Sequence, residues 1–87
     1  MTQITAGRIV LYRIHDYDLQ GRTFTTGNAP RAGDIVPLIV VRVWENEFGD
    51  QPGVNGQLIL DCPEGTLWVC SKGEGTENGK WFWPSKV

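Results

Sequence analysis

The segment AGDIVPLIVVRVWE, residues 32–45, is the longest apolar run in the chain and constrains the fold more than any other stretch. It is dense in β-branched side chains, which pack well on a pleated surface and lose rotamer freedom in a helix, so it predicts a β-strand. Side chains alternate along a strand, and both alternating faces are apolar here. One face would hold Ile35, Ile39, Val41 and Val43, and the other Val36, Leu38, Val40 and Trp44. We therefore expect both faces to be covered, by a barrel that folds over the strand or by a second subunit.

The other apolar runs are short, and turn-forming residues separate them. They predict further strands at residues 7–14, 54–61, 66–72 and 80–84. Polar or glycine-rich links would connect the strands at residues 15–31, 46–53 and 73–79. No window carries the apolar stripe of a helix, so we expect no helix.

This arrangement predicts an all-β fold. A long excursion between the first two strands followed by a meander is typical of a small, partly open, SH3-like barrel of about five antiparallel strands. An OB-like barrel is the alternative, although that fold usually places a helix between its third and fourth strands. The 87 residues would form one domain, residues 1–87, because two halves would each be too small to bury a core.

Charge and hydropathy exclude several classes of protein. The net charge of −2 gives no general attraction to nucleic acid or to an anionic membrane. No apolar segment approaches the roughly 20 residues that cross a bilayer, and residues 1–7 lack the apolar core of a signal peptide. We therefore expect a cytoplasmic protein.

The two cysteines, Cys62 and Cys70, flank a turn sequence, Pro63-Glu64-Gly65. If this turn closes a hairpin, the two sulfurs lie on the order of 12 Å apart, which is too far for a disulfide. We expect two free thiols that act as small apolar side chains.

Two tryptophans near the end of the chain, Trp81 and Trp83, would share one face of a strand because they lie two residues apart. An indole N–H needs a partner, which favours a partly open cleft, and a nucleobase stacked on an aromatic ring gains about 1–3 kcal/mol. These residues, with Tyr12 and Tyr17, are therefore candidate ligand-binding residues. The alternative is that the rings fill the core and pack under the long first loop.

Arginine is concentrated in the first part of the chain, and its planar fork matches phosphate in a bidentate way. Arg13 and Arg22 are candidate ligand-binding residues, and Arg8, Arg31 and Lys80 are candidate anion contacts. The alternative is that these side chains pair with nearby carboxylates on a solvated surface.

No motif predicts catalysis. His15, Asp16 and Asp18 are contiguous potential metal ligands, but no second cluster lies at ligand spacing, so we expect no metal site. The segment GEGTENGK lacks the Ser or Thr that ends a phosphate-binding loop. His15 has no evident nucleophile beside it. We expect neither an enzyme nor a cofactor.

Three segments, GRIVLYRI, IVVRVWE and GKWFWP, occur in the order found in a group of small proteins from tailed bacteriophages and prophages. The chain resembles that group, whose members run from GRIVHY through AIVVRVW to GTWHWP. Leu11 and Phe82 stand where the group has histidine. Most members of the group have no assigned role, so the resemblance implies a phage setting more than a function.

The main functional hypothesis is a phage-encoded, non-catalytic binding protein that sequesters a nucleotide signal of bacterial immunity in an aromatic and arginine-lined cleft. The first alternative is a protein-interaction or virion-associated adaptor, since aromatic grooves in SH3-like barrels recognise peptides. The second alternative is a single-stranded nucleic-acid binder, which the net charge disfavours. We also expect a homo-oligomer, a dimer or larger, because the apolar strand and the aromatic residues exceed what a single small barrel easily hides.

Overall fold

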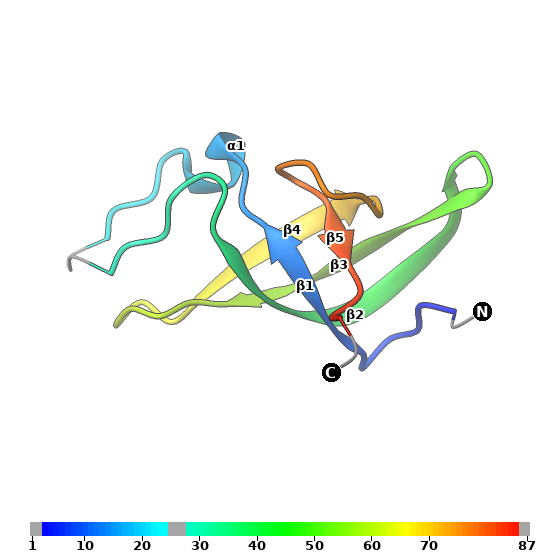
Figure 1. The fold of residues 1–87 in the computed structure, drawn as a ribbon, viewed down its shortest axis with the longest axis horizontal. Coiled ribbons are helices and arrows are strands. Elements are labelled where there is room, and N and C mark those ends of the chain that lie inside the picture. The colour runs from blue at the N-terminus through cyan, green and yellow to red at the C-terminus, as the bar shows by residue number, and fades with distance from the viewer. Residues whose placement is uncertain (1–2, 25–27, 86–87) are drawn as a thin grey trace.

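The computed structural model describes residues 3–24 and 28–85. Its elements in chain order are β1 (Ile9–Arg13), α1 (Asp16–Leu19), β2 (Ile35–Phe48), β3 (Gln51–Ile59), β4 (Thr66–Lys72) and β5 (Trp81–Phe82). The five strands form one sheet in the order β4-β3-β2-β1-β5, and neighbouring strands are antiparallel (Figure 1). A meander of four strands with β5 returned beside β1 confirms the predicted small, partly open, SH3-like barrel.

The sheet curls until its two ends approach each other. Trp81 in β5 donates its backbone N–H to Gly73, just after β4, over 3.0 Å, and its carbonyl accepts from Gly75 over 2.9 Å. These bonds join the turn after β4 to β5, while β4 and β5 themselves share no ladder. The barrel therefore stays partly open, and the inner face of the curled sheet encloses the core.

The core is apolar, and every strand contributes to it. Its fully buried side chains come mainly from alternate positions, as a sheet with one covered face requires. They are Val10, Tyr12, Ile14, Leu38, Val40, Val54, Leu58 and Trp81. Of the closing aromatics, Trp81 lies in this core, whereas Phe82 pairs with Leu11 and is half-buried.

A β-bulge at Val41 changes the predicted faces of the long strand β2. Val40 pairs with Gly56 and Arg42 with Asn55, so Val41 is the extra residue. Beyond the bulge the alternation is reversed: Val43 packs against the core and Trp44 is exposed. The expectation that Val43 shares a face with Ile39, and Trp44 with Val40, is therefore wrong. Within one chain only the inner face of β2 is covered.

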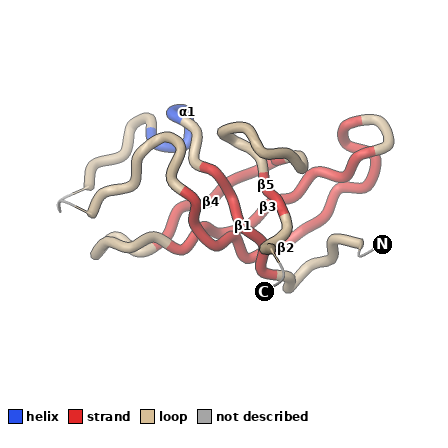
Figure 2. The backbone as a smooth tube through the Cα atoms, in the orientation of Figure 1, coloured by secondary structure: helices blue, strands red, loops and turns tan. Residues whose placement is uncertain are grey.

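The hairpin that joins β2 to β3 is longer than the sequence suggested. Residues 46–53, expected to form a link, belong mostly to the two strands, and only a short turn at Gly49 and Asp50 separates them. The pairing shifts between Trp44 and Phe48, and Asn46 adopts a φ of +61°. Figure 2 shows that this hairpin projects well beyond the rest of the sheet.

The expectation of no helix is also wrong, because one turn of helix, α1, opens the long first loop. His15 is its N-cap and forms a capping box: its Nδ1 accepts from the backbone N–H of Tyr17 over 3.0 Å, and Asp18 accepts from the backbone N–H of His15 over 2.9 Å. A helix of four residues is too short to show an apolar period, so a search for apolar stripes could not find it.

Both cysteines are free thiols, in agreement with the prediction from the turn. Cys62 is half-buried against the core, whereas Cys70 is exposed and accepts a hydrogen bond from the Trp68 indole over 3.0 Å. Only Cys62 therefore acts as the small apolar side chain that was expected.

At Gly56, opposite Val40, the packing of the sheet leaves no room for a side chain. A Cβ atom there would collide with the backbone oxygen of Ile39 and with Leu38 Cδ1, and backbone cannot move aside cheaply. We expect Gly56→Ala to lower the free energy of unfolding by about 1–3 kcal/mol, measured by urea denaturation. Gly73→Ala is the matched control, since the nearest side-chain atoms there, on Phe48, lie 3.4 Å away. Equal stability of the two variants would contradict this account of the packing.

Candidate functional site

A hollow of about 590 Å³ in the described structure lies between the projecting β2–β3 hairpin, the N-terminal segment and β5. The indoles of Trp81 and Trp83 form part of its wall, and the carboxylates of Glu45, Asp50 and Glu74 line it as well. Its volume falls in the range of small-molecule sites, which are typically about 300–1,000 Å³. The structure thus places Trp81 and Trp83, two of the candidate binding residues, in the lining of one hollow.

The two indoles meet at a right angle. Their ring centroids are 5.7 Å apart with an interplanar angle of 85°, the edge-to-face arrangement that aromatic pairs favour. Trp81 is only 1% exposed, and its Nε1–H has no acceptor among the described residues. Trp83 is half-buried, and the guanidinium of Arg8 lies 5.8 Å from the centre of its ring. Part of the wall of the hollow is thus aromatic, with Trp83 as the more exposed of the two rings.

Another part of the wall is acidic, and sequence reasoning missed it. Glu45 and Asp50 come from the hairpin and Glu74 from the turn after β4, so they are distant in sequence. No Lys or Arg is among the described residues that line the hollow. Asp50 and Glu74 lie in segments that the sequence predicted as links, and Glu45 lies at the end of the predicted long strand, so no local pattern related the three carboxylates to the tryptophans.

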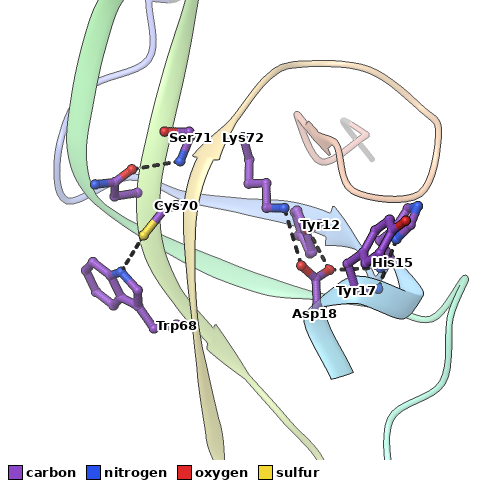
Figure 3. A network of polar contacts seen from close by, with 9 residues as sticks. Tyr12, His15, Tyr17, Asp18, Trp68, Cys70, Ser71 and Lys72 are labelled. Carbon is purple, nitrogen blue, oxygen red and sulfur yellow. Dashed lines mark hydrogen bonds and ion pairs between the residues drawn. The ribbon is translucent and has the colours of Figure 1, made fainter. Parts of the chain in front are cut away.

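Tyr12, a candidate ligand-binding residue, is instead fully buried and holds α1 in place. Its hydroxyl donates to Asp18 Oδ2 over 2.7 Å, and the Lys72 ammonium lies 3.3 Å from Asp18 Oδ1 (Figure 3). Burial, with the adjacent Asp18 carboxylate, raises the pKa of the Tyr12 hydroxyl well above its ordinary value, so it remains a donor at any physiological pH. The Asp18 side chain is only 4% exposed. Tyr12 therefore has no ring face available to a ligand.

The other candidates near the first loop lie apart from the hollow. Tyr17 is 72% exposed on α1, with its ring stacked on His15 at 4.9 Å. Arg13 is tied to the backbone: its Nε donates to the Thr76 carbonyl over 2.9 Å, and its guanidinium lies 5.8 Å from the Phe82 ring. The structure therefore does not join these residues to Trp81 and Trp83.

The candidate anion contacts are dispersed as well. Arg22 is exposed in the first loop, and Arg31 lines a separate, smaller hollow of about 390 Å³. The Lys80 ammonium lies 5.9 Å from the Phe48 ring. Of the basic residues singled out in the sequence, Arg8 is the one that contacts a tryptophan of the larger hollow.

Within residues 3–24 and 28–85, no group of three or more His, Cys, Asp or Glu side chains is placed to hold a metal ion. The same part of the chain contains no helix with the length and hydropathy needed to cross a membrane.

Comparison of the chain with protein-family models, with curated proteins and with solved structures found no match. The candidate site therefore rests on its own geometry.

The Tyr12 hydroxyl is the best place to test how the first loop is anchored. We expect Tyr12→Phe to lower the free energy of unfolding by about 1–3 kcal/mol, because the buried Asp18 carboxylate loses a donor. The matched control is Tyr17→Phe, which removes an exposed hydroxyl and should change stability by less than about 0.5 kcal/mol. Urea denaturation measures both, and a neutral Tyr12→Phe would show that the hydrogen bond does not anchor α1.

Proposed function

We propose that this protein is a non-catalytic binding protein whose ligand occupies the hollow beside Trp81 and Trp83. The observation that carries the proposal is the pair of perpendicular indoles in the wall of a 590 Å³ concavity, one of them with an unpartnered buried N–H. Trp83, the half-buried member of the pair, offers a ligand an aromatic surface in this hollow.

Sequestration of a nucleotide is the form of this proposal that follows from the resemblance to phage proteins, and it would act in the host cytoplasm. Its support in the structure is Arg8, whose guanidinium lies 5.8 Å from the Trp83 ring. A base stacked near Trp83 could direct a phosphate toward that guanidinium. The carboxylates that line the hollow oppose this form, because they would repel the remaining phosphates.

Indole NMR signals test the proposal directly, because each tryptophan side chain gives its own ¹H–¹⁵N peak. We expect at least one of three probes, cyclic di-AMP, cyclic ADP-ribose or N-acetyl-arginine N-methylamide, to shift the Trp81 and Trp83 peaks in a saturable way. Trp83→Leu should abolish this binding. Trp68→Leu, on the other face of the sheet, should leave it unchanged. Shifts confined to Trp68, or no saturable shift, would contradict the proposed site.

Self-association is the second part of the proposal, and the outer face of the sheet supports it. Ile9, Ile39, Gln57 and Trp68 are paired across four strands and so lie in one row on this face. Ile9 is 60% and Trp68 46% exposed, although both are large and apolar. Exposed apolar patches of this kind mark interaction surfaces in soluble proteins. The same face would serve the alternative role, an adaptor that binds another protein.

Light scattering after gel filtration tests self-association. We expect a mass of at least twice the 9.7 kDa chain at micromolar concentration. A charge in the middle of an apolar interface is strongly unfavourable, so Trp68→Glu should return the protein to a monomer, whereas Tyr17→Glu on exposed α1 should not. A monomeric unmodified protein would overturn this part of the proposal and leave the hollow unaffected.

A further inference from the structure

The charged residues that line the hollow indicate which kind of ligand it would bind. We infer that its ligand presents an organic cation, a guanidinium or an alkylammonium group, to the carboxylates of Glu45, Asp50 and Glu74. This inference rests on the proposed function, since it names the chemistry of a ligand bound in the same hollow.

The carboxylates converge from separate segments onto one concavity. Glu45 lies near the end of the β2 arm, Asp50 in the hairpin turn and Glu74 in the turn that pairs with β5. Each of the three side chains is exposed, and none forms an ion pair with a lysine or arginine of the described structure. A hollow lined by one sign of charge concentrates ions of the opposite sign, and here those ions are cations.

Two basic side chains near the hollow, those of Arg8 and Lys80, lie over aromatic rings. Arg8 lies over the Trp83 ring and Lys80 over the Phe48 ring, and neither lines the hollow. Among the described residues that line the hollow there is thus no counter-charge to the three carboxylates, and a cationic ligand would supply one.

The aromatic wall suits the same class of ligand. The face of an indole attracts a cation within about 6 Å of its centre, and Arg8 already meets this condition at Trp83. Trp83 is half-buried and offers a ligand an indole surface, whereas Trp81 is buried behind it in edge-to-face contact, and the carboxylates line the same hollow. A planar guanidinium or a methylene-linked ammonium can contact an aromatic surface with its apolar part while its charge faces the acids. Amide oxygens of Gln3 and Gln51 in the lining are further acceptors for its N–H groups.

Two sources carry this chemistry, a basic side chain of a peptide and a free polyamine. We would titrate the ¹⁵N-labelled full chain with N-acetyl-arginine N-methylamide and with spermidine. The key control is the citrulline counterpart of the arginine compound, which has nearly the same shape but no charge. Cyclic di-AMP supplies the anionic comparison.

We expect the arginine compound to shift the Trp81 and Trp83 indole peaks with a dissociation constant at least about tenfold lower than that of the citrulline compound. Neutralising single carboxylates by Glu45→Gln or Glu74→Gln should weaken binding about two- to fivefold each, as for exposed ion pairs. Glu77→Gln, an exposed carboxylate in the same loop as Glu74 but outside the lining, should leave binding unchanged. Tighter binding of spermidine than of the arginine compound would assign the site to free polyamines, and the reverse order would assign it to basic peptides.

The outcomes separate this inference from the proposed function. Equal binding of the arginine and citrulline compounds, or preferred binding of cyclic di-AMP, would overturn the inference of a cationic ligand but would still support the hollow as a binding site. No saturable indole shift with any of the four probes would remove both.

Discussion

The burial of Trp81 is the interaction on which the rest of this structure depends. Its indole fills the core beside Tyr12, the residue with which it pairs across β1 and β5. A side chain of this size removes roughly 150–250 Å² from water, more than any other residue in so small a core. The backbone of Trp81 then holds Gly73 and Gly75, which brings the turn after β4 onto β5. One residue thus fills the core, draws the ends of the sheet together and forms part of the wall of the hollow.

The hollow exists because the β2–β3 hairpin does not follow the plane of the sheet. A β-bulge bends a strand and increases its twist, and β2 carries one at Val41 and a second irregularity between Trp44 and Phe48. Gly56 pairs with Val40 at the first bulge, and because it has no Cβ its backbone can lie close to that of Ile39. Beyond it the hairpin projects from the sheet (Figure 1), and its Glu45 and Asp50 line the same hollow as Trp81 and Trp83.

The hollow and the outer face of the sheet differ in chemistry. The hollow combines rigid indoles with carboxylates, a composition that favours a small, charged, directional contact. The outer face presents a mostly apolar row from Ile9 to Trp68 across four strands, interrupted by Gln57, which favours a broad and less directional contact. Because the two surfaces share no residue, ligand binding and self-association can be altered separately. Meanwhile the buried Tyr12, Asp18 and Lys72 contacts fix α1 and take no part in either surface.

The sequence by itself determined the all-β class, the approximate strands and the pairing of Trp81 with Trp83 on one face, because β-branched runs, turn residues and alternation are local signals. It also determined the range of β4, residues 66–72, since the preceding Pro and Gly mark a turn. Only the tertiary structure decided the bulge at Val41, the burial of Tyr12 and the one-turn helix α1, which depend on packing and capping partners. The acidic wall was equally a tertiary result. The projecting hairpin and the returning strand β5 bring Glu45, Asp50 and Glu74 into the lining of one hollow. The spacing of these residues along the chain does not predict that they lie close together.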